Sequence, residues 1–405
     1  MLADCDLCVI YSSMSKTKSE RTKAKPTIAP SDVEAHIGTL FARDLHAKRV
    51  LSLANATAGV IHAGALGVHA IGRGLAIARG LVDKHAIKQV DRFLSNTYIN
   101  VWFLAAMWIP YVIGALKEVR INLDWTDFES DGHTMLVASL QTHHGRSIAL
   151  LWMTVSKSSL KNMTNEYEFN LLRRLREIIK HDVHVTIIAD RGFEDPALFK
   201  LLKDELQFDY IIRFKGLITV TDEHGVSKPA SQWVGRNGRM RVMRNVRLTA
   251  REFPVATVVC VHAKGMKDPW CLASSDPKCN GPSLIKYYSK RFSIEEMFRD
   301  IKDLRYGMGM SWNSITDPDR RDRMFLVAVL AQSLLTILGE AGEQVKLDWM
   351  LKANTSTKRS LSLLRQGLMW YERIPTMPED RLLLLMNRFS YLLTEHKLFG
   401  SIFIA

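Results

Sequence analysis

Three carboxylates in the sequence have surroundings that suit divalent-metal chemistry. Asp124 ends the predicted strand "INLD", and Asp190 ends the apolar run "VTIIAD". Two ionised aspartates at the ends of neighbouring strands would repel each other unless cations neutralised them. Glu295, on a predicted helix across the same edge, would complete a site for two Mg²⁺ or Mn²⁺ ions. Two such ions about 4 Å apart promote displacement at phosphorus, so we expect the three carboxylates to converge for phosphodiester chemistry.

A polar row on the stretch "YYSKRFSIEEMFRDIK" surrounds the third carboxylate. Its members, separated by three, four and seven residues, are Tyr288, Arg291, Glu295 and Lys302. At about 100° per residue this spacing places all four in one narrow sector of a helix. The apolar residues cluster in the neighbouring sector, so the helix can pack on a core and still display the row. A charged helix face is usually only solvated surface. Residues 287–302 by themselves do not exclude that interpretation.

Structural explanations and neighbouring acids compete with the three assignments. Asp124 could simply end a strand, and Asp190 could be a turn aspartate paired to its neighbour. Asp127 could replace Asp124 as a ligand, but the alternation of the strand favours Asp124. Glu296 could replace Glu295, but only Glu295 lies in the sector of the polar row.

The segments that must position these residues predict a mixed α/β core. From Val119 the pattern indicates three strands, a helix, a buried strand, a second helix and a further strand. Residues 216–282 are rich in short β segments and are interpreted as an insertion in this core. The polar row follows, and Asp317-Pro318 then begins a long apolar helix. From Lys346 onward the pattern is again helical.

Composition and charge restrict the class of protein. The chain has 405 residues, of which 47% are hydrophobic, and a formal net charge of +13. These values predict a globular protein with a polyanionic partner, most simply nucleic acid. Its five cysteines lack zinc-finger spacing and are interpreted as reduced cytosolic thiols. The apolar stretches 101–116 and 324–338 are shorter than the about 20 residues that span a bilayer, which favours buried helices and no membrane.

The N-terminal part predicts a basic tail followed by a helical DNA-binding region. Residues 1–30 contain the charged run "SKTKSERTKAKP" with no apolar core after it, so we expect a flexible tail and no signal peptide. Residues 31–117 show helical periodicity, with two short helices joined by a turn near Gly80. This is helix-turn-helix-like spacing, although small helical hairpins are common. The second helix carries a basic row that suits phosphates or a groove, namely Lys84, Lys88 and Arg92.

Together these features resemble the cut-and-paste DDE transposases of bacterial insertion sequences, in the family numbered four. The polar row matches that family's Y-R-E-K signature in every term. The segments "LDWTDF" and "IIADRGF" resemble its first and second aspartate motifs, in the right order. The resemblance covers residues 119–307 well and implies an RNase H-like core, with flanking helical parts only similar in general plan.

The resemblance also implies roles for individual residues. Asp124, Asp190 and Glu295 would be the catalytic triad that binds two Mg²⁺ ions, with Mn²⁺ able to substitute. Trp270 would fill the space left by a flipped base, although a core tryptophan on a strand is an equal alternative. The residues that would hold phosphates near the transposon end are Tyr288, Arg291 and Lys302.

The implied function is a DNA transposase that binds terminal inverted repeats, cleaves through a hairpin intermediate and joins 3′ ends to target DNA. Its partners would be double-stranded DNA of the transposon ends and target, and a second copy in a synaptic dimer. The expected location is the bacterial cytoplasm, at the nucleoid when DNA is bound. The alternatives are an RNase H-like nuclease without strand transfer and a helix-turn-helix regulator whose carboxylates are structural.

The expected organisation has six parts. They are a basic tail (1–30), a helical DNA-binding region (31–117), the first part of the core (118–215), a β-rich insertion (216–282), the second part of the core with Glu295 (283–345), and a C-terminal helical region that could dimerise (346–405).

Overall fold

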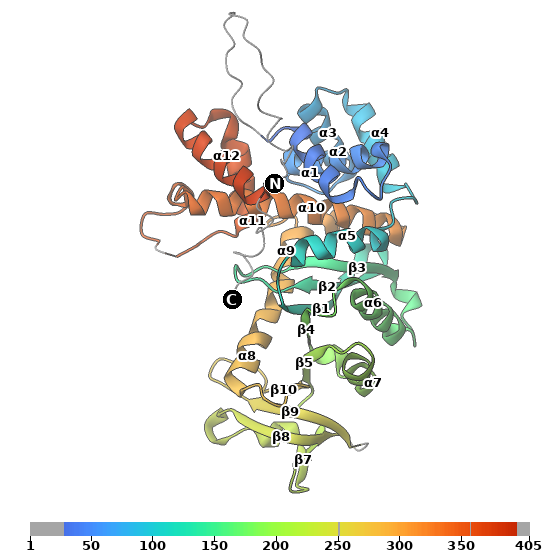
Figure 1. Cartoon of the computed structure of the whole chain (residues 1–405), viewed down its shortest axis with the longest axis vertical. Coiled ribbons are helices and arrows are strands. Elements are labelled where there is room, and N and C mark those ends of the chain that lie inside the picture. Colours follow the sequence, from blue (N-terminus) through green and yellow to red (C-terminus); the bar gives the residue numbers. More distant parts are fainter. Residues whose placement is uncertain (1–27, 250–251, 357, 395–405) are drawn as a thin grey trace, which may run out of the picture.

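The computed structural model describes residues 28–249, 252–356 and 358–394. In Figure 1 the N-terminal and C-terminal helices lie at one end of the molecule and a long sheet extends to the other. The main helices are α1 (Pro30–Phe41), α2 (Ala47–Ala63), α3 (Val68–Arg79), α4 (Asp83–Leu94), α5 (Val101–Ile113), α6 (Thr164–Ile178), α7 (Pro196–Lys200), α8 (Gly281–Ser289), α9 (Ser293–Lys302), α10 (Pro318–Gln344), α11 (Leu363–Arg373) and α12 (Glu379–Thr394).

The described strands form one sheet in the order β3-β2-β1-β4-β5-β10-β9-β8-β6-β7. Their bounds are β1 (Glu118–Phe128), β2 (His133–Leu140), β3 (Ile148–Ser156), β4 (His184–Ala189), β5 (Asp209–Phe214), β6 (Thr219–Thr221), β7 (Ser227–Pro229), β8 (Arg241–Leu248), β9 (Phe253–Val261) and β10 (Trp270–Ser274). Strand β4 runs parallel to β1 and β5, whereas β2 is antiparallel to β1 and β3. This mixed sheet with its helices confirms the predicted α/β class with an RNase H-like core.

The β-rich segment continues the core sheet. Strand β10 pairs antiparallel with β5, and β9 then pairs with β10. Figure 1 shows these strands extending the sheet away from the helical end. The segment is an insertion in chain order, but its ladder hydrogen bonds make it part of the same sheet as the core.

The stretch with the polar row is not one uniform α-helix. Helix α8 ends at Ser289, a 3-10 turn covers Lys290–Phe292, and α9 begins at Ser293. A 3-10 turn rotates each residue by 120° rather than 100°, so three such residues turn Tyr288 relative to Glu295 by about 60°. This rotation moves Tyr288 from about 20° on one side of Glu295 to about 40° on the other, so the expected single helix is interrupted but the row is not dispersed.

Helix α10 is the central helix of the helical end. It packs on β3, α2, α11 and α12, and Figure 1 shows it crossing between the N-terminal helices and the sheet. By length and composition it is the one described helix that could cross a membrane unaided, but 94% of its apolar window is buried inside the protein. Its predicted start at Asp317-Pro318 is confirmed, and Asp317 is its N-cap. Such burial is typical of a core helix.

Reduced cysteines were expected, and those in the described part of the chain are free. They are Cys260, Cys271 and Cys279, of which the first two are buried. Cys5, Cys8 and the predicted basic tail up to residue 27 lie outside the described residues.

Candidate functional site

The register of two parallel strands brings the two aspartates side by side. The last paired residues of β1 and β4 are Leu123 and Ala189, and Asp124 and Asp190 each follow one of them. Strand β1 does not end at Asp124 as predicted, because its antiparallel pairing with β2 continues to Phe128. Asp124 instead lies where the parallel ladder stops, at the edge of the sheet where α/β proteins place their sites.

A buried arginine joins the first aspartate to the glutamate. Arg291 Nη1 donates a hydrogen bond to Asp124 Oδ2 at 3.0 Å, and Arg291 Nη2 donates to Glu295 Oε1. Only 6% of Arg291 is exposed, whereas the Glu295 side chain is 49% exposed. The guanidinium therefore holds a strand carboxylate and a helix carboxylate together at the edge of solvent.

The pKa of Asp124 depends on the charges of the other two acids. Burial raises the pKa of Asp124 to about 6, the Arg291 charge opposes this shift, and the carboxylates of Asp190 and Glu295 add to it. Asp190 itself accepts a hydrogen bond from the Gly192 amide at 2.8 Å, as a turn aspartate does. The three acids thus lie within range of one another at one partly open site.

The carboxylates are not yet spaced as the ligands of one ion. Within the described residues, no group of three or more His, Cys, Asp or Glu side chains has metal-site geometry. Convergence to ligand spacing was predicted, and the difference follows from Arg291, whose guanidinium ion-pairs with both Asp124 and Glu295. A bound cation would have to replace part of that positive charge.

A buried polar network aligns the helix of Glu295 with the strand of Asp124. Asn122 Nδ2 donates to Ser293 Oγ at 3.1 Å, two residues before each acid. Gln141 Nε2 donates to Asn122 Oδ1 at 2.7 Å, and the Ser147 amide donates to the Ser293 carbonyl at 3.1 Å. These four side chains are buried, so the contacts fix the position of α9 on the sheet.

The two competing acids have other partners. Asp127 Oδ2 lies 3.1 Å from Lys157 Nζ, and half of the Asp127 side chain is exposed. Glu296 lies 3.1 Å from a guanidinium nitrogen of Arg146 and also pairs with Arg299. The charges that shift the pKa of Asp124 come from Asp190, Glu295 and Arg291, which favours the original choice in both cases.

Tyr288 is buried rather than displayed on a polar face. Only 1% of it is exposed, and it packs in an apolar cluster on the sheet with Ile188 and Leu272. Its ring meets the ring of Trp270 edge to face, with centroids 4.9 Å apart. Trp270 is partly buried at the start of β10, and its ring lies 6.2 Å from that of the exposed Phe292.

The structure adds a cation to this aromatic cluster. Arg213, near the end of β5, donates from Nη2 to the Pro269 carbonyl at 3.3 Å and also hydrogen-bonds Tyr288, whose pKa burial raises. Its pairing partner on β10 is Leu272, two residues beyond Trp270. Arg213 was not among the predicted site residues, although an arginine in the mostly apolar strand "FDYIIRF" was a signal for it.

Lys302 contacts the end of β1. Its Nζ donates to Thr126 Oγ1 at 2.9 Å and to the Asp127 carbonyl at 2.5 Å, and lies 4.7 Å from the ring centre of Phe128. Burial lowers the pKa of Lys302. In this state the lysine ties the last turn of α9 to the strand that carries Asp124.

The predicted helical hairpin is present at the N-terminal end. Helices α3 and α4 are joined at Gly80, which adopts a left-handed φ of 64°. Three cations on α4 are exposed, and they are Lys84, Lys88 and Arg92. Among the carboxylates of this helix, Asp91 pairs with Arg320 of α10 at 2.6 Å. The basic row therefore faces solvent, where it is free to meet a polyanion.

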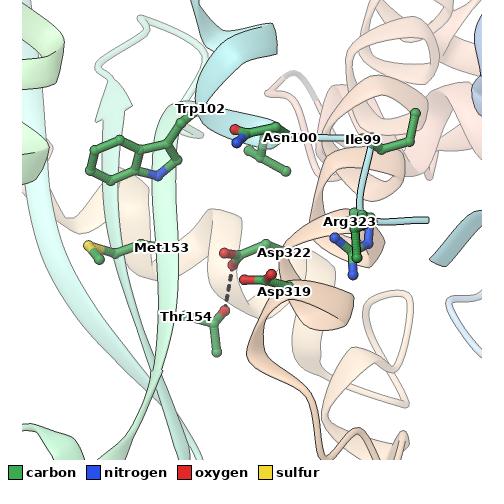
Figure 2. A pocket seen from close by; sticks show the side chains of 10 residues that line it. Ile99, Asn100, Trp102, Met153, Thr154, Asp319, Asp322 and Arg323 are labelled. Carbon is green, nitrogen blue, oxygen red and sulfur yellow. Dashed lines mark hydrogen bonds between the residues drawn. The ribbon is translucent and has the colours of Figure 1, made fainter. Parts of the chain in front are cut away.

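A separate cavity of about 310 Å³ lies between the start of α5, β3 and α10. Figure 2 shows Asp319 and Asp322 at its wall, and Thr154 Oγ1 donates to Asp322 at 2.6 Å. Burial raises the pKa of Asp322 to about 8. Arg323 also lines the cavity, and none of the three acids of the candidate site does.

Sequence comparison places the chain in a known family. No curated protein matches the chain. A family model described as "Transposase DDE domain" matches residues 119–332, which are more than half of the 405 residues. The matched segment contains Asp124, Asp190 and Glu295 together with the strands that align them. The chain therefore belongs to the DDE transposase family.

Proposed function

We propose that this transposase is a cut-and-paste enzyme of the insertion-sequence family numbered four. It binds the terminal inverted repeats of its element, cleaves each end through a hairpin and joins the freed 3′ ends to target DNA. The spacing of Tyr288, Arg291, Glu295 and Lys302 supports this assignment. The observation that carries the proposal is that Arg291 joins Asp124 to Glu295 while Asp190 lies close enough to raise the pKa of Asp124.

The donor set suits a hard divalent cation. DDE transposases as a family use divalent metal ions, and the three acids offer carboxylate oxygens of the kind that Mg²⁺ and Mn²⁺ prefer. Asp124 is held by one cation, Arg291, against two neighbouring negative charges, so added positive charge is favoured there. Asp124, Asp190 and Glu295 would hold a metal pair. When bound, the pair would supply activation of the attacking oxygen and stabilisation of the leaving oxygen of a phosphodiester.

The residues around the triad would bind and orient the DNA end. Arg291 is charged and already at the site, so it can exchange one carboxylate partner for a phosphate oxygen. Lys302 holds α9 against β1 and can exchange its contact with the Asp127 carbonyl in the same way. Trp270, partly exposed beside Tyr288 and Phe292, offers an aromatic face to an unstacked base.

Affinity for the inverted repeats would come from surfaces outside the triad. The exposed row of α4 presents Lys84, Lys88 and Arg92 to the phosphate backbone or a groove. On α12 the apolar side chains of Leu383 and Leu384 are exposed. This exposed apolar surface supports the C-terminal region as a contact between two copies in a synaptic dimer. The complex would act in the cytoplasm.

A strand-transfer assay tests the proposal. Purified protein is incubated with a duplex carrying the terminal sequence that flanks the coding region, supercoiled target DNA and Mg²⁺. The expected products are nicked ends, hairpin ends and ends joined to the target. Cleavage without joining would identify a nuclease instead. Binding without cleavage by the wild type, with DNA binding itself lost in Asp124→Asn, would identify a DNA-binding regulator whose carboxylates are structural.

A further inference from the structure

The loop between α9 and α10, residues 303–317, leaves large apolar side chains in solvent while its backbone is fixed. Leu304 is 57% exposed, Tyr306 63% and Trp312 74%. The same loop buries Met308, Met310 and Ile315. The two exposed aromatic side chains, Tyr306 and Trp312, therefore stand on a segment that is anchored by three buried apolar residues, where they are accessible to a partner.

The first half of the loop is folded onto the end of α9. The Asp303 carboxylate accepts hydrogen bonds from the amides of Arg305 and Tyr306 at 2.8 and 2.6 Å. Gly307 allows a close approach, because a Cβ there would lie 2.4 Å from the carbonyl oxygens of Arg299 and Asp300. The exposed side chains are thus held on an ordered backbone, which lowers the entropic cost of binding a partner.

The second half of the loop is tied to the N-terminal helices and to the β1–β2 turn. The Leu66 amide donates to the Met308 carbonyl at 2.8 Å, and Asn313 Nδ2 donates to the Leu66 carbonyl at 2.9 Å. The Ile315 amide donates to Asp131 Oδ2 at 3.2 Å. The loop therefore spans the surface from the last residue of α9, seven positions after Glu295, to the turn between α2 and α3.

We propose that Tyr306 and Trp312 form a stacking surface for unpaired bases of DNA beside the catalytic site, with Arg305 contacting the backbone. Arg305 is exposed and its guanidinium lies 5.2 Å from the ring centre of Tyr306. Aromatic rings with an arginine are the composition that binds unstacked bases, and the net charge of +13 favours a polyanion over an apolar protein partner. The inference rests on the proposed function, because it takes the DNA at the triad as its ligand.

The test compares single strands with and without bases. The full-length protein, without divalent ions, is titrated by fluorescence anisotropy against a labelled oligothymidine of about 15 nucleotides and against an abasic strand of equal length. Tyr306→Ala and Trp312→Ala should each weaken oligothymidine binding about five- to tenfold and leave abasic binding unchanged. Arg305→Ala should weaken both strands alike.

Trp349→Ala is the matched control. Trp349 is 56% exposed but follows the far end of α10, a helix of 27 residues and about 40 Å, whereas Trp312 precedes its start. The control should bind both strands like the wild type. Wild-type affinity of the Tyr306 and Trp312 variants for oligothymidine would overturn the inference. So would variants that bind DNA like the wild type but differ from it in molecular mass by light scattering, because the loop would then contact a second copy. Strand transfer, assayed in parallel, reports on the proposed function separately.

Discussion

Removing the hydroxyl of Ser293 should slow DNA cleavage without weakening DNA binding. Ser293 Oγ accepts a hydrogen bond from Asn122 Nδ2, and this contact lies two residues from Glu295 on one side and two from Asp124 on the other. In Ser293→Ala the backbone bond from the Ser147 amide and the ion pair of Arg146 with Asp300 remain. Helix α9 should therefore stay docked but lose its side-chain alignment with β1.

The magnitude follows from burial. Asn122 is fully buried, so its amide nitrogen would be left without a partner, at a cost of about 1–3 kcal/mol of unfolding free energy. The effect on rate should exceed the effect on binding, because a reacting group misplaced by about 1 Å can cost about a hundredfold. We expect first-strand nicking to fall about ten- to a hundredfold while end binding changes less than about twofold.

The assay combines urea unfolding, gel-shift affinity and single-turnover nicking. Ser293→Thr, which keeps a hydroxyl, should recover most of the rate. Thr57→Ala is a matched stability control, because it removes a buried hydroxyl bonded to the Leu53 carbonyl at 2.9 Å within α2. If Ser293→Ala and Thr57→Ala lost similar stability and both nicked at the wild-type rate, the alignment argument would be refuted.

Three further predictions concern charge. Replacing Lys84, Lys88 and Arg92 together by alanine should reduce the slope of log affinity against log salt by about three, measured by anisotropy with an end duplex; an unchanged slope would remove α4 from the interface. Arg291→Ala breaks a buried ion pair, so calorimetry should show a free energy of unfolding about 3 kcal/mol lower than in the wild type. Mg²⁺ should stabilise this variant more than it stabilises the wild type, and an equal gain in both proteins would contradict the prediction. Burial raises the pKa of Glu168 from 4.5 to about 7, so the folded protein is more stable when this carboxyl is protonated. That contribution to stability is fully present below about pH 4.5 and is lost as the pH rises through about 7. Glu168→Gln should therefore gain stability over wild type, by up to about 3 kcal/mol at pH 8 relative to pH 4, and parallel pH profiles in urea unfolding would sink this prediction.

The sequence predicted the features that depend on local pattern. Alternation and apolar runs located β1 and β4, and the step of four residues between Arg291 and Glu295 placed these two side chains side by side. The turn at Gly80 was visible because a left-handed glycine ends a helix. These features depend on neighbours within a few residues, which periodicity and turn chemistry report.

The remaining features depend on contacts between distant parts of the chain. Neither β10 nor β5 has a sequence pattern that identifies the other as its partner. The sequence therefore could not predict that the insertion continues the core sheet. Asn122 and Ser293 are 171 residues apart, and neither residue type indicates its partner. Tyr288 is buried against Ile188 and Leu272 of the distant strands β4 and β10, and the helical period does not indicate those contacts.

The identity of the third acid is the central claim, and adjacent glutamates allow a direct test. Glu295 ion-pairs with Arg291, which also pairs with Asp124, whereas Glu296 pairs with Arg146 and Arg299. The measurement is Mg²⁺-dependent first-strand nicking by Glu295→Gln and Glu296→Gln, with end binding measured on the same preparations. Glu295→Gln, like Asp124→Asn, should bind ends and not nick, and Glu296→Gln should nick at close to the wild-type rate. Near-wild-type nicking by Glu295→Gln, or equal losses in the two glutamate variants, would contradict the proposed triad.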